Sequence, residues 1–493
     1  MFKFALLLFL VATLARSSTA ATVVSCLEDH GLEVEDSQSP NWMDATTPFN
    51  TRFRYIPAAI VYPKKTSDVS EAVLCAVKYG LHVSALSGGH SYSASGYGSR
   101  NGTLVVNLRN MGRISPHSSS DNNFVIQSGI RLGDMASELY SEYNRSMAHG
   151  TCPWVGLGGH AGFGGWGLAS RNWGLVIDQV IAAELVQADG TVVNVSATER
   201  PELYWAIRGA SASYGIVTQY TMKTQEAPVN VTRFAYNFAF NFTADDRAPE
   251  RFAEILSAYQ NWSFTAPKEI GIVANVWQLG QDLELGGIYM GSRTDFDPIA
   301  ASLLNATGEP SQRYVQERSW IEALEEVNGV TKLSTEGIPE PRDTFHAKSL
   351  VVSMENPLAP DSFSKLAKNF TTSIPSNFSW FIQFELWGGH NSHISSIPAD
   401  ATAYPHRNHH WTVQFYGRTN GSWFPQYTEF VDGLADTLAQ GKELGAYANY
   451  LDPYLQGWKK KYYDRNYARL EEIRKKTDPS GVFLKSQNIG AAD

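Results

Sequence analysis

The sequence predicts an α+β protein with two domains, on three observations. The chain has 493 residues, which exceeds the size at which a single hydrophobic core stops growing. Strand and helix patterns alternate through the first half, as they do in α+β and α/β folds. From about residue 230, apolar residues recur at every second position, which is typical of antiparallel strands with one buried face.

Charge excludes one class of partner. The formal net charge is -9 and the isoelectric point is near 5.8. Such a chain lacks the excess of basic residues that binding to phosphate backbones requires. We therefore expect no nucleic-acid partner.

The first 20 residues have the pattern of a secretory signal peptide. A basic Lys3 precedes an apolar run at residues 4–14, and small residues end the segment ahead of Ala21. This run is too short to span a bilayer, and no later segment is long and apolar enough to do so. We expect a secreted protein with no membrane partner. Sequons for N-glycosylation support export, and they begin at Asn101, Asn144, Asn194, Asn230, Asn241, Asn261, Asn305, Asn369, Asn377 and Asn420.

Three cysteines remain after the signal peptide. In an oxidising compartment two are expected to pair, and Cys26 and Cys75 are the expected disulfide because both lie in the N-terminal region. Cys152 is left over, inside the glycine-rich stretch HGTCPWVGLGGH that begins at His149. Its thiol is either a small buried apolar group or a covalent link to a cofactor.

A strand–helix–strand unit opens the mature chain. Strands are predicted at residues 58–62 and 83–86, and Ser67 is placed to cap a helix at residues 68–79. The glycine turn SGGHSY follows the second strand, where backbone N–H groups form an anion site suited to a pyrophosphate. His90 lies at the edge of this turn, either facing a ligand or bonded to backbone as an ordinary loop residue.

Further elements follow up to about residue 225. Strands are predicted at residues 104–108, 124–127 and 216–222, helices at 133–143 and 201–207, and a hairpin at 183–187 and 192–195. Gly162, Gly164 and Gly167 spell the dinucleotide pattern GxGxxG. That pattern should follow a hydrophobic strand directly, and here it follows a glycine loop, so we do not expect a nicotinamide site.

The second half is predicted to form a sheet with one polar and aromatic face. Strands are expected at residues 234–242, 270–278, 283–290, 379–387 and 410–416. Alternation places Phe381, Gln383, Glu385 and Trp387 opposite an apolar face. This second face is either a carbohydrate-binding wall or the solvated side of an antiparallel sheet.

The C-terminal third adds helices and a histidine cluster. Helices are predicted at residues 363–370, 425–440 and 458–475. The spacing of His406, His409 and His410 fits no zinc signature, so we expect a hydrated loop and no metal.

Four motifs together resemble a known family. They are SGGHSY from Ser87, HGTCPWVGLGGH from His149, DGTVVNVSATERPELYWAIRGASASYGIV from Asp189, and AYANYLDP followed by YYDRNYARLEEIRKKTDPSGVF. In this order they resemble the FAD-linked oxidases of the berberine-bridge-enzyme-like group, which have the vanillyl-alcohol-oxidase type of fold. The combination of HGTCP, FIQFELWGG and WTVQFYG looks like the fungal oligosaccharide oxidases within that group.

The resemblance implies a two-part FAD-binding domain and a substrate domain whose antiparallel sheet is covered by helices. On this basis residues 1–20 are the signal peptide and residues 21–225 form the first part of the FAD-binding domain. Residues 226–440 form the substrate domain, and residues 441–493 return to the FAD-binding domain. A monomer is expected.

The resemblance also implies a doubly attached FAD. His90 would bond the 8α carbon of the flavin and Cys152 the ring carbon 6. Val155 matches a small residue associated with oxygen access. The other expected FAD-binding residues are Ser87, Gly88, Gly89, Ser91, Gly156, Gly159, His160, Gly215 and Val217.

For the reaction, Tyr450 takes the place of the family's catalytic base and Glu385 that of its proton relay. Gln383, Gln414 and Trp387 match positions that contact the sugar. The implied activity is oxidation of the reducing-end anomeric hydroxyl of an oligosaccharide to a lactone, with oxygen reduced to hydrogen peroxide. Two alternatives stay open: an oxidase of the same fold acting on an alkaloid, phenolic or other secondary metabolite, and a secreted carbohydrate-binding flavoprotein without turnover.

Overall fold

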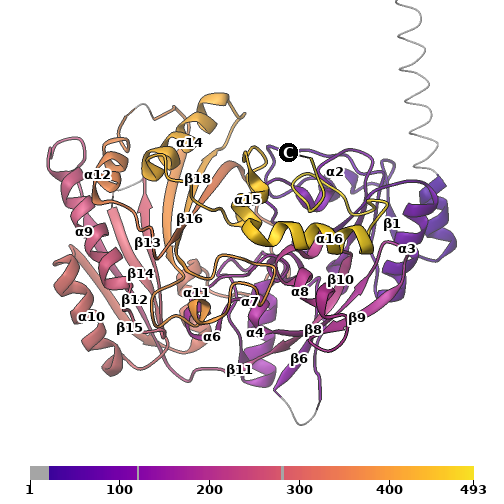
Figure 1. The fold of residues 1–493 in the computed structure, drawn as a ribbon, viewed down its shortest axis with the longest axis horizontal. Coiled ribbons are helices and arrows are strands. Elements are labelled where there is room, and N and C mark those ends of the chain that lie inside the picture. The colour runs from indigo at the N-terminus through magenta and orange to yellow at the C-terminus, as the bar shows by residue number, and fades with distance from the viewer. Residues whose placement is uncertain (1–21, 119–121, 279–281, 373, 493) are drawn as a thin grey trace, which may run out of the picture.

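The computed structural model describes residues 22–118, 122–278, 282–372 and 374–492. The predicted signal peptide lies outside these residues. Helices and largely antiparallel sheets make up the described chain, which confirms the α+β class (Figure 1). No helix in this part of the chain has the length and apolar character needed to cross a membrane.

The first sheet carries the predicted strand–helix–strand unit. Its strand order is β1-β2-β4-β3, with β2, β4 and β3 parallel. Helix α3 (Thr66–Lys78) joins β2 to β3 and buries Val69, Val73 and Ala76 against the core. The turn SGGHSY therefore starts where a parallel strand ends. The strands are β1 (Val34–Glu35), β2 (Ala59–Val61), β3 (Val83–Leu86) and β4 (Leu104–Asn107).

The second sheet is antiparallel and has the order β5-β6-β10-β8-β9. The predicted hairpin is the β8–β9 pair. Its strands are β5 (Ile114–Pro116), β6 (Asn123–Gln127), β8 (Val180–Val186), β9 (Val192–Ser196) and β10 (Ile216–Lys223), and β7 (Arg145–Ser146) pairs with β11 (Gln225–Glu226) beside it. The helices of this half are α2 (Trp42–Ala45), α4 (Leu132–Tyr143), α5 (Leu157–His160), α6 (Ser170–Trp173), α7 (Val176–Gln179) and α8 (Pro201–Ala210).

The third sheet has the antiparallel order β15-β12-β14-β13-β17-β18-β16. Along β17, Ile382 and Phe384 point into the hydrophobic core, whereas Gln383 and Glu385 face a cavity. The predicted alternation of this strand is therefore present. The strands are β12 (Val231–Ala239), β13 (Ile270–Trp277), β14 (Asp282–Tyr289), β15 (Gln312–Arg318), β16 (Thr344–Ser353), β17 (Ser379–Leu386) and β18 (His409–Thr419).

Helices cover the apolar face of this sheet, and the other face is turned toward the N-terminal half (Figure 1). Phe252 and Leu256 of α9 are completely buried there, together with Leu434 of α14, which is nearly so. The covering helices are α9 (Ala248–Ser263), α10 (Arg293–Thr307), α12 (Pro360–Lys368) and α14 (Pro425–Ala439), while α11 (Trp320–Asn328) and α13 (His393–Ser396) lie elsewhere.

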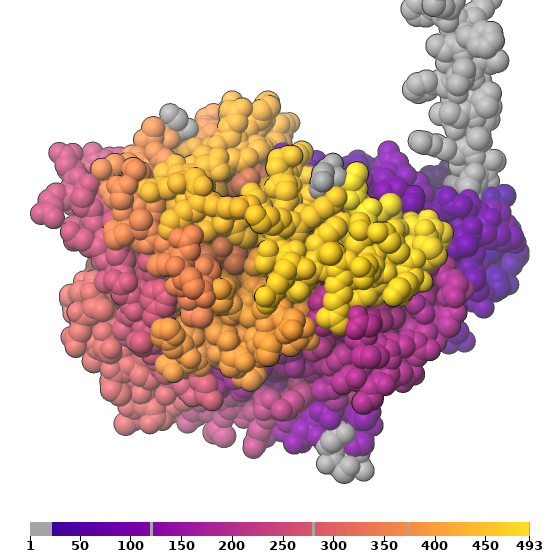
Figure 2. Space-filling model, viewed as in Figure 1, coloured from indigo at the N-terminus to yellow at the C-terminus, as the bar shows by residue number. Residues whose placement is uncertain are grey.

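The C-terminal segment returns to the N-terminal half. Helices α15 (Trp458–Tyr463) and α16 (Tyr467–Thr477) share a hydrophobic cluster with the second sheet. The Tyr214 hydroxyl donates to the carbonyl of Leu470 at 2.8 Å, and the Val83 N–H donates to that of Val482 at 2.8 Å. Figure 2 shows this yellow segment lying on the magenta surface of the first half.

Several local predictions were wrong. Helix α3 begins at Thr66, one residue before the predicted cap Ser67, and no side chain caps it. The single helix predicted at residues 458–475 is two helices, because Asp464 takes a positive φ of 42° and starts a 3-10 turn. The pattern did not predict α9, α10, α11, β15 or β16.

The histidine cluster is not a hydrated loop. His409 and His410 are completely buried in β18. The His409 ring stacks on Trp387 at 4.4 Å, and its two nitrogens lie within hydrogen-bond distance of the Tyr404 and Thr412 hydroxyls, at 3.0 and 2.8 Å. Internal partners therefore replace the water that the prediction assumed.

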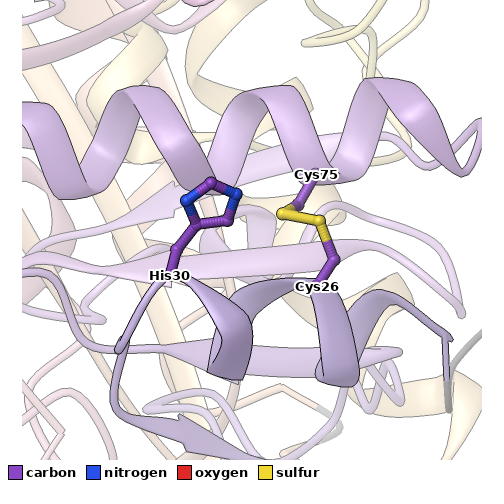
Figure 3. A group of neighbouring side chains, drawn as sticks. All are labelled: Cys26, His30 and Cys75. Carbon is purple, nitrogen blue, oxygen red and sulfur yellow. A yellow bond between two sulfur atoms is a disulfide. The ribbon is translucent and has the colours of Figure 1, made fainter.

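The predicted disulfide is present between Cys26 and Cys75, and it ties the helical residues 22–29 to α3 (Figure 3). His30 lies beside it. Within the described residues this is the one group of histidine, cysteine and acidic side chains whose ligand atoms come within 4.8 Å of one another. The two sulfur atoms are bonded to each other, so they are not thiolate ligands for a metal.

Two buried arginines join the N-terminal half to the sheet domain. The guanidinium of Arg171 is completely buried and donates to carbonyl oxygens of residues 266–270 and of Gly388 at 2.6–3.0 Å. Arg407 forms a two-point ion pair with Asp178, both contacts at 2.8 Å. Both charges of this pair are almost fully buried.

Candidate active site

A cavity of about 590 Å³ lies between the glycine turns of the N-terminal half and the polar face of the third sheet. Apart from Trp387 and the disulfide cysteines, every residue that the sequence assigned to the site lines this cavity. These are Ser87, Gly88, Gly89, His90, Ser91, Cys152, Val155, Gly156, Gly159, His160, Gly215, Val217, Gln383, Glu385, Gln414 and Tyr450.

The two glycine loops touch each other. A Cβ atom placed on Gly156 would lie 2.0 Å from the backbone nitrogen of Gly88, and one placed on Gly88 would lie 2.3 Å from that of Gly156. No side chain fits at this contact. Ser87 fastens it, because its hydroxyl donates to the Ser128 carbonyl at 2.6 Å and accepts the Gly158 N–H at 3.3 Å. The backbone here is thus open to a large planar or anionic ligand.

His90 is held as a neutral ring with an unused nitrogen. It stacks on Phe49 at 3.8 Å, and its Nε2 is buried without a hydrogen-bond partner. Burial, with a smaller effect of Arg131, lowers the pKa of the imidazole to about 3. A neutral imidazole with a free lone pair is a nucleophile, so this residue fits a covalent bond to a cofactor.

Cys152 lines the same cavity as His90. Burial raises the pKa of its thiol, although hydrogen bonds from the backbone of Trp154 and Val155 act in the opposite direction. The sulfur is therefore a protonated thiol in an enclosed site, and it becomes reactive only when a base or an electron-poor partner is at hand.

His160 has a structural position beneath the cysteine loop. The Gly150 N–H donates to its Nε2 at 2.8 Å, so the ring carries its proton on Nδ1. Burial lowers the pKa of His160 to about 3, which keeps the ring neutral and able to accept. The Asn449 amide donates to the His160 carbonyl at 3.3 Å, which connects this loop to the segment that carries Tyr450.

Tyr450 and Glu385 form a buried hydrogen-bonded pair. The phenol donates to Glu385 Oε1 at 2.5 Å, and the indole N–H of Trp387 donates to Oε2 at 3.0 Å. Burial raises the pKa of Glu385 to about 7, against the opposing effect of these two donors. Burial and the nearby carboxylate raise the pKa of Tyr450 well above its ordinary value.

Trp387 therefore lies behind the carboxyl group and not in the cavity wall. It is completely buried, stacked on Trp166 at 5.8 Å. Alternation still holds at the end of β17, since Leu386 belongs to the hydrophobic core and Trp387 to the cluster on the other face, but all of Glu385, Leu386 and Trp387 are buried there. The contact that the structure gives Trp387 is with Glu385, and its contact with a sugar stays a prediction.

Tyr92 belongs to the site although the sequence did not single it out. Its ring lies parallel to that of Tyr450, 5.5 Å between centroids at an angle of 6°. The Gln414 amide donates to its hydroxyl at 2.7 Å. The one sequence signal was its place at the end of SGGHSY, next to the predicted cofactor residues.

A row of polar side chains crosses the third sheet. Glu284, Asn275, Gln383 and Gln414 stand at paired positions of β14, β13, β17 and β18, and all four line the cavity. Asn275 donates to Glu284 at 3.1 Å, and Gln383 donates to Asn275 at 2.9 Å. Amide groups fixed in a row offer oriented donors and acceptors to a polyhydroxylated ligand.

An aromatic row lies two residues farther along the same strands. Trp277, Phe381 and Tyr416 occupy paired positions, with ring centroids 5.2 and 4.8 Å apart. Trp277 lines the cavity and is 41% exposed, so it stands at the rim. Since strand residues advance about 3.4 Å each, Phe381 lies about 14 Å along β17 from Glu385.

Comparison with known proteins agrees with this geometry. Residues 57–196 match the family described as FAD binding domain, and residues 446–490 match the family described as berberine and berberine like. The chain is 32% identical to a carbohydrate oxidase of Microdochium nivale, over 96% of this chain and 95% of that one. It is 36% identical to an FAD-linked oxidoreductase of Metarhizium anisopliae, over 95% and 91%.

A solved structure of glucooligosaccharide oxidase from Acremonium strictum superposes with a TM-score of 0.88 at 31% identity, covering 95% of this chain and 99% of that one. Identity at this level over nearly the whole length confirms the family that the motifs predicted. The chain belongs to the berberine-bridge-enzyme-like family of FAD-linked oxidases.

Proposed function

We propose that this protein is a secreted FAD-dependent oligosaccharide oxidase, which converts the anomeric hydroxyl at the reducing end to a lactone and releases hydrogen peroxide. The observation that carries the proposal is the Tyr450–Glu385 hydrogen bond beside the row of amide groups, in the cavity that also holds the glycine turns. Relatives named carbohydrate oxidase and glucooligosaccharide oxidase support the substrate class.

Tyr450 and Glu385 act together to remove the proton of the anomeric hydroxyl. A phenol with a raised pKa is a poor free base, but it need not ionise if it passes its own proton on as it receives one. Tyr450 takes the proton of the anomeric hydroxyl while its own proton moves to Glu385 Oε1, 2.5 Å away. The negative charge of Glu385 therefore passes through the sugar oxygen and leaves with the hydride as the neutral lactone carbonyl forms, and Glu385 ends neutral.

The chemistry that FAD supplies when bound is acceptance of the hydride from the anomeric carbon and transfer of both electrons to molecular oxygen. The lactone then hydrolyses to the aldonic acid. Val155 lines the cavity beside the cysteine loop and, as a small side chain, leaves room for oxygen. Tyr92 holds the ring of Tyr450 by parallel stacking, so that the phenol faces the carboxyl group.

The proposal includes covalent attachment of FAD through His90 and Cys152. The unused nitrogen of His90, the thiol of Cys152 and the contact between their two loops support it. The Acremonium strictum oxidase is described with a 6-S-cysteinyl, 8α-N1-histidyl FAD. Acid-precipitated protein should stay yellow, and tryptic peptides that contain His90 and Cys152 should both carry flavin. Colour that passes entirely into the supernatant would refute attachment.

An oligosaccharide is favoured over a single sugar because the walls continue beyond the reacting end. Beyond the amide row, the aromatic row lies about 14 Å from Glu385 along β17, which is longer than one pyranose ring. Aromatic planes contact the faces of sugar rings, and Trp277 presents such a plane at the rim. Trp277→Ala should raise KM for a trisaccharide more than KM for the matching monosaccharide.

A panel of substrates tests the proposal. Peroxide release should occur with gluco-, xylo-, cello- or chito-oligosaccharides and stop when the reducing end is first reduced to the alditol. The second candidate is oxidation of a secondary metabolite, since the relative at 36% identity is named only as an FAD-linked oxidoreductase. Aromatic alcohols and alkaloids therefore belong in the same panel. Turnover of these, with none of any sugar, would replace the first proposal with the second.

Secretion as a glycosylated monomer completes the proposal. Nine of the ten sequon asparagines are exposed, and Asn369 is half-buried. Attached glycans at those nine positions would meet solvent and not the core. Culture-medium protein should lose mass on endoglycosidase treatment and elute as a single chain in size-exclusion chromatography.

A further inference from the structure

Lys485 is a buried cation on the glycine-turn side of the cavity. It lies after α16, lines the cavity together with the turn SGGHSY, and is 7% exposed. Its ammonium donates to the Ser84 hydroxyl at 3.3 Å and to the Ser95 carbonyl at 3.1 Å. Ser84 belongs to β3, the strand that leads into the turn.

Both of these partners are uncharged. No carboxylate of the described chain forms an ion pair with Lys485, whereas the half-buried Lys348 has Asp432 and Asp452 each at 3.2 Å. Burial alone lowers the pKa of Lys485 to about 8, without a compensating charge. A buried ammonium that lacks a counter-charge is unfavourable unless a bound anion provides one.

The distribution of charge along the cavity indicates which anion would bind Lys485. The other permanently basic group that lines the cavity, Arg233, lies on β12 in the field of Glu284, at the sheet side. His90 and His160 are neutral. Of the two basic side chains that line the cavity, Lys485 is thus the one on the side of the turn whose backbone N–H groups are suited to a phosphate.

We propose that the Lys485 ammonium binds the diphosphate of FAD and forms the charged part of the diphosphate site, with the glycine turn as the uncharged part. FAD carries two negative charges there, and a charge-assisted hydrogen bond would satisfy the ammonium that burial leaves without a counter-ion. The inference rests on the FAD binding domain and not on the identity of the oxidised substrate, so a negative sugar panel leaves it intact.

Phosphorus NMR of the holoenzyme tests the contact directly. The diphosphate resonances of the wild type should shift as Lys485 loses its proton, between about pH 8 and about pH 10.5. In Lys485→Arg they should stay constant over this range, because a guanidinium keeps its charge. Equal titration in both proteins, or none in either, overturns the proposal. Both outcomes are readable without sugar oxidation.

Flavin affinity provides the second test. In a chain with His90→Ala and Cys152→Ala, which holds flavin without a covalent bond, adding Lys485→Met should raise the Kd for FAD about tenfold or more. The Kd for riboflavin, which has no phosphate, should not change. Lys442→Met is the matched control, since Lys442 also donates to a backbone carbonyl but lies away from the cavity. An equal loss of affinity for FAD and riboflavin overturns the proposal.

Discussion

At the scale of single residues, the protonation of Glu385 decides when the catalytic pair can accept a proton. Its pKa is about 7 in the folded protein, so the carboxyl group is neutral below this pH and cannot accept. We expect kcat/KM to rise as the pH increases through about 7 and to level off above it. In Glu385→Gln this rise should disappear, and flavin reduction should slow about 10²–10⁴-fold.

Glu284→Gln is the matched control, because Glu284 lines the same cavity but does not contact Tyr450. It should keep the rise near pH 7 and change mainly KM. If kcat/KM still rises near pH 7 in Glu385→Gln, Glu385 does not accept the proton.

Tyr450→Phe tests the other half of the pair. In the proposed reaction the phenol takes the proton of the sugar hydroxyl, so its loss should slow flavin reduction about 10²–10⁴-fold, as measured by stopped-flow absorbance. The visible flavin spectrum should be retained, because the ring still stacks on Tyr92. Reduction at the wild-type rate would show that another group removes the proton.

A substitution at Trp387 distinguishes between two roles for this residue, positioning of Glu385 and contact with the substrate. Its indole N–H stabilises the carboxylate form of Glu385, so Trp387→Phe should raise the pKa of Glu385 and move the rise in kcat/KM to higher pH. KM for sugar should change little, since Trp387 does not line the cavity. A large change in KM with an unmoved pH profile would restore the contact that the sequence suggested.

At the scale of elements, the contact between the two glycine loops controls the cofactor. Gly156→Ala would push a methyl group to within 2.0 Å of the Gly88 nitrogen, so the loops that carry His90 and Cys152 must separate. Flavin per chain, measured by absorbance and intact mass, should fall sharply. Gly433→Ala is the matched control, because its methyl group meets nothing within 4 Å and the residue lies away from the cavity. Equal flavin content in both variants would contradict this account.

The elements show what could be predicted from local pattern and what could not. The strands β17 and β18 were predictable because strict alternation reports one buried face. Helices α9 and α10 were missed although their buried faces are apolar. The contact of Gly88 with Gly156 and the position of Lys485 join segments far apart in sequence, so no local pattern reports them. Glu385 and Trp387 share one face, but alternation does not report that one donates a hydrogen bond to the other.

At the scale of the whole molecule, buried charges join the two halves around the cavity. Removing one partner of the Arg407–Asp178 pair would leave the other charge buried, which costs about 3–5 kcal/mol. Arg407→Met should therefore lower the free energy of unfolding in urea by about this amount. Arg469→Met, which breaks the exposed pair with Glu202, should cost less than about 1 kcal/mol. Equal effects would mean that the buried pair does not hold the halves together.

The whole-chain prediction was strongest where the resemblance supplied it. Composition and periodicity alone predicted two domains and left both the α+β and the α/β class open. That the last residues return to the first half was predicted from the family motifs, because the sequence of an amphipathic helix does not indicate which surface it packs against. The boundaries at residues 226 and 441 stay predictions, although one hydrophobic cluster is confined to residues 234–444 and another combines residues from both ends of the chain.

The meeting of Gly88 with Gly156 has a practical consequence for handling the protein. Under the proposed double attachment, FAD can be bound covalently only after the chain has folded, because the loops of His90 and Cys152 meet only in the folded protein. The amount of covalently bound flavin per unit of protein would then measure how much of a preparation is correctly folded. A pale batch from a recombinant host would indicate misassembled material before any enzyme assay is run.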